Sequence, residues 1–393
     1  MDVILAMQPM LSTFPLRKLP FVALKHVIKV MEIDEIIKIA ITSKYMESIV
    51  KFCCIRSRGT IVSLDGEYTY VGLHHPKVIL FCCTKTFNHP SAPKLTKEDL
   101  KPWLSETSTT LENTRQLFTR IYNLFQCGPY RLMINSSTEN IKENLEIPEF
   151  RNFEALFLYW EHFKKEQLDE VMEFEREIQD LHILKSEIPE DYYHPNLFKY
   201  RDVHYCDARW IRLEHLLSIK NNGVITLGKN NLTIPDINTF LHHWMNSEYE
   251  LFKFISIDIE KGSSIPLDCS VRLLSVNSPK TRNRQIMSIV WTDSRIGMST
   301  WSIHERPKQM DRNDDSLMHF DKPYVPEFEV LQLLKQRRVL NLKLKIVEED
   351  SLEKRELIKK IDETNNQLQL KGVEYENGWP FLRGIDASGK VLA

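Results

Sequence analysis

Apolar residues near the start of the chain recur at the spacing of an amphipathic helix. A first stripe runs from Leu24 to Met31, a second covers residues 33–41, and a third covers residues 45–50. Apolar positions three and four apart place their side chains on one face of a helix. Pro20 suits a first helical turn, where its missing N–H is not needed. The pattern predicts three short helices within residues 19–52. They carry more apolar surface than they can bury among themselves, so we also expect a docking partner.

Beyond residue 75 the pattern changes to short apolar runs that alternate with helical periods. The runs that predict strands are residues 78–81, 130–134, 155–158, 181–184, 224–227 and 254–257. The stretches that predict helices are residues 111–125, 162–178, 210–219 and 234–245. This alternation is typical of βα units with a parallel sheet. The intervals between strands are too irregular for a strict repeat.

Residues 224–233 resemble the strand and asparagine turn of a leucine-rich repeat. Alternating apolar residues enter a core, and an Asn of the pair Asn230 and Asn231 then bonds the backbone of the turn. Thr233 is suited to cap the helix that follows, with Asp236 in its first turn. We therefore expect an irregular, leucine-rich-repeat-like curved sheet.

The C-terminal third is less regular. Residues 265–326 are rich in Ser, Arg, Asn and Asp, and we expect an insertion or a weakly folded loop there. Residues 327–364 predict two helical pieces, of which the second spans Ile346 to Ile361. The charged residues of the second piece are expected to form a solvent-exposed helix face.

Composition excludes several classes of function. The 393 residues carry a net charge of −2 and are 42% hydrophobic, so we expect a folded protein that does not bind nucleic acid. The apolar start has no basic flank, and no run of about 18 apolar residues occurs, so we expect neither a signal peptide nor a membrane span. The 7 Cys are odd in number and show no framework spacing, which indicates free thiols in a reducing compartment.

The first segment carries a family resemblance. Residues 14–50, FPLRKLPFVALKHVIKVMEIDEIIKIAITSKYMESIV, are similar to an F-box, in the version of the large nematode family of F-box proteins with a type 2 F-box-associated domain. The resemblance implies an F-box over residues 14–55 that binds the Skp-type adaptor of a cullin-RING ubiquitin ligase. By position, the implied adaptor contacts are Leu19, Pro20, Leu24, Val27, Ile28, Ile36, Ile37, Ser43 and Lys44. The alternative is a small helical bundle that packs only on the rest of the protein.

Later segments resemble the associated domain of the same family. ARWIRLEHLLSI, VITLGKNNLTIPDINTFLHHWMNS and LFKFISIDI, within residues 205–260, are similar to its core. LQLKGVEYENGWPFLRGIDASGKVLA, at the end of the chain, is similar to its closing strands. The fold class expected is α+β/α/β: a small three-helix F-box, then an irregular leucine-rich-repeat-like α/β domain over residues 75–393.

Motifs for other kinds of chemistry are incomplete in this chain. Gly384 to Lys390 matches seven positions of a P-loop, but Val391 has no hydroxyl for Mg²⁺ and no helix can follow. His74–His75 and His242–His243 are adjacent pairs without metal-ligand spacing. We therefore expect no catalytic residue, no cofactor and no metal. Among the tryptophans, Trp210 and Trp244 are predicted to lie in the core, while Trp291 and Trp301 are candidates for recognition.

These features predict a protein that is not an enzyme. The resemblance implies a substrate receptor of a Skp/cullin/F-box ubiquitin ligase, cytoplasmic and/or nuclear, that binds an adaptor, through it a cullin, and an unknown target protein. Such a receptor would speed ubiquitin transfer by raising the effective concentration of a target lysine near the conjugating enzyme. One alternative is a binding scaffold that uses the F-box-like module outside ubiquitin transfer. The other is an enzyme that lacks a recognised motif.

Overall fold

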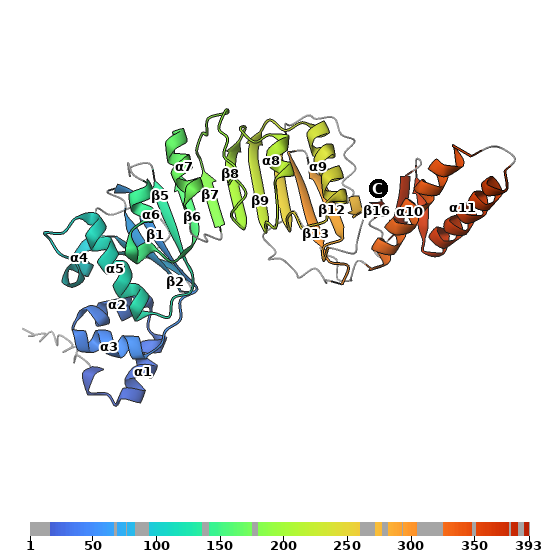
Figure 1. The fold of residues 1–393 in the computed structure, drawn as a ribbon. Helices are drawn as coiled ribbons and strands as arrows, with labels where there is room; N and C mark the ends of the chain where they lie inside the picture. The colour runs from blue at the N-terminus through green and yellow to red at the C-terminus, as the bar shows by residue number, and fades with distance from the viewer. Residues whose placement is uncertain are drawn as a thin grey trace, which may run out of the picture. The chain divides into compact units, whose positions relative to one another are not determined.

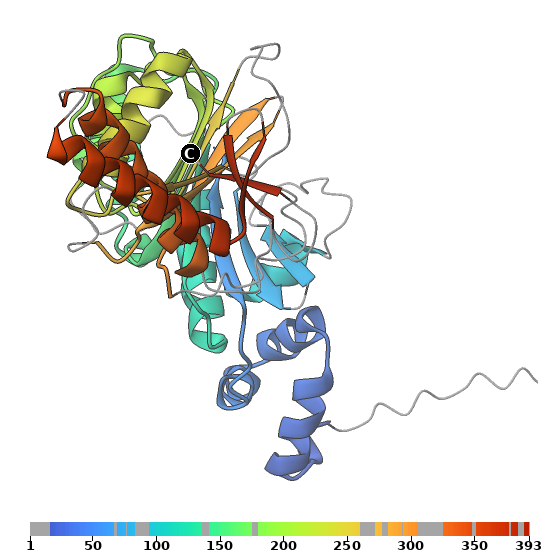
Figure 2. The same ribbon diagram turned by 90° about the vertical axis from the view of Figure 1, so that its right-hand side faces the viewer.

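The protein is described here from a computed structural model (Figures 1 and 2). The chain forms two compact units, residues 1–156 and 157–393. The division falls inside strand β6 (Phe153–Tyr159), whereas the predicted domains were residues 14–55 and 75–393. The residues that the structure describes are 16–66, 69–75, 77–82, 94–135, 141–174, 180–259, 272–276, 282–292, 294–304, 325–347, 351–376, 379–383 and 389–392.

Unit 1 begins with the three helices that the apolar stripes predict. They are α1 (Phe21–Val30), α2 (Ile33–Ile41) and α3 (Lys44–Phe52), after a short 3-10 turn at Leu16–Lys18. Local signals set their starts. Pro20 is the N-cap of α1, and the Ser43 hydroxyl accepts a hydrogen bond from the Met46 backbone N at 3.3 Å to cap α3.

A small sheet follows in unit 1. Its strands are β1 (Gly59–Leu64), β2 (Tyr70–His75), β3 (Lys77–Cys82), β4 (Lys94–Leu95) and β5 (Tyr130–Asn135), in the order β5-β1-β2-β3-β4. The helices of this part are α4 (Lys97–Leu100), α5 (Thr110–Leu124) and α6 (Ile141–Leu145). The sequence reading missed β1 and β2 because polar residues interrupt the apolar pattern: Thr60 and Ser63 are buried in β1.

Unit 2 contains a run of four parallel strands, three of which the βα alternation predicts. Strands β7 (Asp180–Leu184), β8 (Asp202–Ala208), β9 (Val224–Asn230) and β10 (Phe254–Asp258) pair in parallel in chain order. In the chain, α7 (Lys165–Glu173) precedes β7, α8 (Leu213–Leu217) lies between β8 and β9, and α9 (Ile234–Asn246) lies between β9 and β10. Figure 1 shows α8 beside α9. Strand β8 is not predicted from the sequence, because Asp202, His204 and Asp207 interrupt its alternation of apolar and polar residues.

Successive residues of these strands point to opposite faces of the sheet. Val203, Tyr205, Ile225 and Leu227 are buried, whereas the residues between them in β8 and β9 are partly exposed. The Tyr205 ring contacts the ring of Trp210, just before α8, so the buried residues face the helices. The other face of these strands is the open face.

Antiparallel strands extend this sheet within the stretch 265–326. Strand β13 (Arg295–Trp301) pairs with β10, and β12 (Ile286–Thr292) and β11 (Arg272–Ser275) follow. The expectation of a weakly folded loop is therefore corrected for these residues. The strands are not recognised in the sequence because several of their buried residues are polar, such as Ser288 and Thr300. The rest of the stretch lies outside the described residues.

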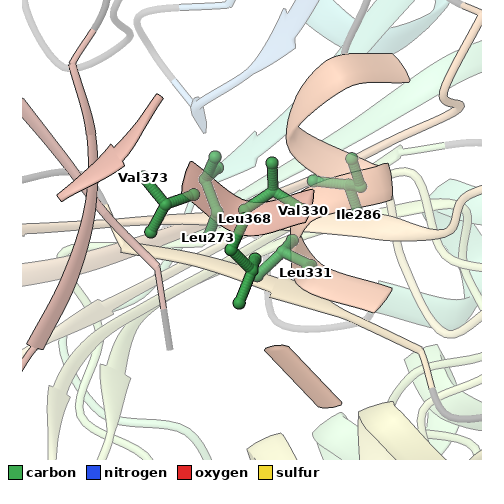
Figure 3. Close-up of a cluster of buried hydrophobic side chains, with 6 residues drawn as sticks. All are labelled: Leu273, Ile286, Val330, Leu331, Leu368 and Val373. Atoms are coloured by element: carbon green, nitrogen blue, oxygen red, sulfur yellow. The ribbon is translucent and has the colours of Figure 1, made fainter. Parts of the chain in front are cut away.

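The C-terminal part adds two long helices and three strands. They are α10 (Val325–Leu344), α11 (Leu352–Leu370), β14 (Val373–Glu376), β15 (Trp379–Arg383) and β16 (Gly389–Leu392). The two predicted helical pieces are confirmed, but the second begins at Leu352, because the Ser351 hydroxyl caps it. Figure 3 shows the core that joins these helices to the sheet: Leu273, Ile286, Val330, Leu331, Leu368 and Val373. The P-loop-like residues 384–388 lie outside the described residues.

Candidate functional site

The N-terminal helices form a small bundle with its own apolar interior. Side chains from all three helices are buried in it: Leu24, Ile28, Ile33, Ile36, Ile37, Ala40, Met46, Ile49 and Val50. On α2, Glu32 and Glu35 form a capping box, in which the Glu32 N–H donates to Glu35 Oε2 at 3.1 Å. The bundle is therefore a packed unit with defined helix ends.

The predicted adaptor contacts divide between this interior and its surface. Leu24, Ile28, Ile36 and Ile37 are each at most 2% exposed. A side chain packed this way cannot also offer its surface to a partner, so these four are core residues of the bundle. The remaining predicted contacts stay accessible to different degrees: Leu19, Val27 and Ser43 are half-buried, and Pro20 and Lys44 are exposed.

Other apolar residues are left outside. The exposed large apolar residues of the bundle are Phe21, Val22, Val30, Tyr45 and Phe52. Tyr45 and Phe52 are 63% and 66% exposed, and their spacing of two helical turns places them on one side of α3. We call this pair the α3 patch. Sequence reasoning missed it, although the seven-residue spacing was a usable signal.

Helix α3 also packs against the rest of unit 1. Glu47 accepts hydrogen bonds from Arg120 of α5 at 3.2 Å, and the Arg120 guanidinium lies 5.7 Å from the centre of the Trp103 ring. α3 therefore has one side fixed to α5 and another side, with the α3 patch, open. This arrangement presents the patch on a supported helix rather than on a free one.

The segment from β8 to β10 has a turn held by side-chain hydrogen bonds. Asn230 Nδ2 donates to Gly228 O and to Asp258 O, both at 2.7 Å, and Asn230 Oδ1 accepts from the Leu232 N–H at 3.0 Å. The predicted asparagine turn is confirmed, with Asn230 as the main residue. Thr233 and Asp236 cap α9 as predicted, and the hydrogen bonds from Thr233 lower the pKa of Asp236.

Replacement of Asn230 by Ala is expected to lower the free energy of unfolding by about 1–3 kcal/mol, because it leaves two backbone carbonyls without their donor. Asn231→Ala is the matched control, since Asn231 is exposed and its side-chain amide donates to Arg209 O at 3.0 Å. Urea unfolding of both variants checks this. Equal losses in the two variants would show that Asn230 does not hold the turn.

An aromatic core lies behind the same segment. Trp210 is 1% exposed, and Tyr192 and Tyr205 contact its ring edge to face. Tyr205 donates its hydroxyl proton to Leu197 O at 2.6 Å, and Tyr200 donates to Val171 O at 2.5 Å. Burial raises the pKa of both tyrosines, so their hydroxyls stay neutral donors. The predicted burial of Trp210 and Trp244 is confirmed.

The described residues contain neither a cluster suited to hold a metal ion nor a helix suited to span a membrane. Among them, no group of three or more His, Cys, Asp or Glu side chains lies close enough to hold a metal ion. Within the same part of the chain, no helix is both long enough and apolar enough to span a bilayer. Cys53, Cys54, Cys127 and Cys206 are free thiols.

Comparison with known proteins identifies one part of the chain. The model of the F-box associated family matches residues 193–257, which cover β8, α8, β9, α9 and most of β10. The resemblance to an F-box-associated domain is confirmed for this segment. The searches of curated proteins and of solved structures gave no match.

Proposed function

We propose that this protein is the substrate receptor of a Skp/cullin/F-box ubiquitin ligase. The observation that carries the proposal is the F-box associated match at residues 193–257, in a chain that begins with a three-helix bundle. In this proposal the bundle is the F-box that binds the Skp-type adaptor. Unit 2, a leucine-rich-repeat-like sheet, binds the target protein. The chain acts in the cytoplasm and/or the nucleus.

Exposed apolar surface on the bundle supports this role. Val30 on α1 is 85% exposed, and Tyr45 and Phe52 form the α3 patch. Burial of exposed aromatic side chains of this kind against a partner protein stabilises the complex. The proposed adaptor surface therefore shifts from the buried residues Ile28 and Ile36 to these exposed ones.

The proposed mechanism needs no catalytic residue in this chain. A receptor that binds adaptor and target together raises the effective concentration of a target lysine beside the conjugating enzyme. Rate then depends on geometry and on the two binding affinities. A scaffold role outside ubiquitin transfer is distinguished by adaptor binding that does not bring a cullin.

The double substitution Tyr45→Ala/Phe52→Ala is expected to weaken adaptor capture about a thousandfold, since two aromatic contacts of about 2 kcal/mol each are removed. Both positions are exposed, so the fold should be retained. The measurement is co-purification and titration of the full chain with a Skp-type adaptor.

The matched control is Leu352→Ala/Leu370→Ala on α11, where both residues are at least 74% exposed. It removes apolar surface far along the chain and should leave adaptor capture unchanged. The proposal is abandoned if the wild-type chain captures no Skp-type adaptor. If it captures one equally well with and without the α3 patch, the F-box surface lies elsewhere on the bundle.

A further inference from the structure

A cavity opens on the open face of unit 2. Its volume is about 470 Å³, and β8, β9, β10, β12 and β13 supply most of its lining. Figure 1 labels β8, β9, β12 and β13 among these strands. The cavity is formed by residues that lie up to about a hundred positions apart, so only the sheet brings them together.

The floor of the cavity is a row of strand partners with small side chains. His204 pairs with Thr226, Thr226 with Ser256, Ser256 with Gly297, and Gly297 with Val290. Because partners in register point to the same face, this row crosses five strands on the open face. Its centre holds only two hydroxyl side chains and a glycine, and this lack of bulk leaves the space for a ligand.

Apolar and cationic side chains surround this floor. Phe254 and Trp301 are the aromatic lining residues, and Trp301 was a candidate for recognition from sequence. Lys253, Arg284 and Arg295 also line the cavity. Among the described lining residues there is no Asp or Glu. The lining thus combines an apolar body with positive charge.

The three cations differ in how they are engaged. Arg295 Nε donates to Asp258 Oδ1 at 2.8 Å at one end of the cavity. Arg284 Nη1 donates to Thr300 O at 2.6 Å, and the Arg284 backbone N–H donates to Glu250 Oε1 at 2.7 Å, so a carboxylate also lies beside this residue. Lys253 is exposed, and no ion pair joins it to the described residues. Burial lowers the pKa of His204, so its imidazole adds no charge near neutral pH.

Ser256 gives a second, independent indication of a ligand. It is 4% exposed, it lies on the cavity floor, and its hydroxyl oxygen has no hydrogen-bond partner among the described residues. A buried hydroxyl without a hydrogen-bond partner is destabilised relative to the same group in water. After rotation about its side-chain bond, a bound amide or carbonyl could supply the missing hydrogen bond.

We propose that this cavity binds an acidic segment of the target protein, with one large apolar side chain of that segment placed between Phe254 and Trp301. This inference rests on the proposed receptor function and assigns its target site. The carboxylates of the segment lie toward Lys253, which is exposed and which no ion pair joins to the described residues. The volume is in the range of sites that enclose a side chain with its flanking backbone.

A protein segment fits better than a single-stranded nucleic acid. Nucleic acid needs a basic track that continues along the phosphate backbone. Here Asp180 and Asp202 occupy neighbouring strands on the open face, and the chain has a net charge of −2. Acidic residues therefore interrupt the basic surface next to the cavity, which favours a short anionic ligand.

The test uses the full-length chain and an array of short synthetic peptides. Each peptide places one Phe, Trp, Tyr, Leu or Ile among Asp and Glu residues, and its counterpart carries Lys in their place. We expect acidic peptides to bind better than their basic counterparts, with affinity that falls as salt is raised. Lys253→Glu and Gly297→Val should each weaken the best peptide about tenfold or more.

A matched variant separates an effect at the site from an effect of total charge. Lys229→Glu makes the same charge change on β9 outside the cavity and should bind the peptide nearly as the wild type does. A labelled oligothymidylate is the second probe. The inference is overturned if no acidic peptide is preferred, if Lys253→Glu and Gly297→Val bind as the wild type does, or if the oligothymidylate binds better than every peptide.

The result is separable from the adaptor experiment. Adaptor capture depends on the α3 patch, and none of its residues lines the cavity. Peptide binding without adaptor capture would leave a target-binding protein outside the ligase. Adaptor capture without peptide binding would keep the receptor function and remove the cavity as its target site.

Discussion

Trp210→Ala is expected to destabilise unit 2 by about 3–5 kcal/mol, the usual loss when a large buried aromatic side chain is removed. The ring is 1% exposed and contacts Tyr205 with centroids 5.2 Å apart. Its Nε1 also donates to Asp207 O at 3.0 Å, at the end of β8. The substitution removes both the packing and the donor, so β8 loses its attachment to the segment before α8.

Two companion variants divide this effect. Trp210→Phe keeps most of the packing and loses the hydrogen bond, with an expected cost of about 1–2 kcal/mol. Tyr193→Ala removes an aromatic ring that is 64% exposed in the same family-matched segment, and should stay within about 0.5 kcal/mol.

Hydrogen exchange measures the effect locally. Because the chain has two units, global unfolding does not isolate the stability of one segment. Amide protection within residues 193–257 measures the stability of the segment that contains Trp210. Protection there should fall in Trp210→Ala. Unchanged protection would mean that Trp210 is not part of the core that holds this segment.

Gly228→Ala is expected to destabilise the same sheet by roughly 1–3 kcal/mol or more through steric overlap. A Cβ at this position would lie 2.3 Å from Cys206 O and 2.9 Å from Cys206 C, both atoms of the neighbouring strand β8. Backbone atoms cannot move aside as a flexible side chain can, so β8 and β9 would have to separate locally.

Gly297 supplies the matched control for this prediction. A Cβ there would lie 3.8 Å from the Phe254 ring and 3.9 Å from Val290 O, which are ordinary contact distances. Gly297→Ala should therefore be neutral or slightly stabilising, since it also restricts the unfolded chain. Thermal or urea unfolding of the pair gives the comparison. Similar behaviour of the two variants would contradict the close approach of β8 and β9.

The same chemical change at two glycines thus has two expected outcomes, and no local pattern separates them. Both lie in strands, and neither conformation requires a positive φ. The difference comes from the partner strand, which the chain meets only after the sheet has formed. The cavity lining depends on the partner strands in the same way: His204 on β8 and Trp301 on β13 are connected only through three successive strand pairings.

Local signals were sufficient for much of the fold. Apolar periods and caps at Pro20 and Ser43 specify the N-terminal helices, because a helix is built from contacts within one or two turns. The strand at 224–227, the Asn230 bond to Leu232 and the Thr233 cap are likewise local, because both bonds join residues close in sequence. The Asn230 bond to Asp258 O depends instead on the next strand. The burial of Trp210 also follows from its place in an apolar stretch.

The amino-acid sequence by itself therefore determined the helices of the bundle, strands β7, β9 and β10 of unit 2 and the similarity of residues 193–257 to the F-box associated family. Tertiary structure alone decided which apolar residues of the bundle are core, such as Ile28, and which are surface, such as Phe52. It also decided that cations and aromatics from distant strands share one cavity. The physical reason is that helical period fixes only the direction of a side chain, whereas burial and register depend on which other elements pack against it.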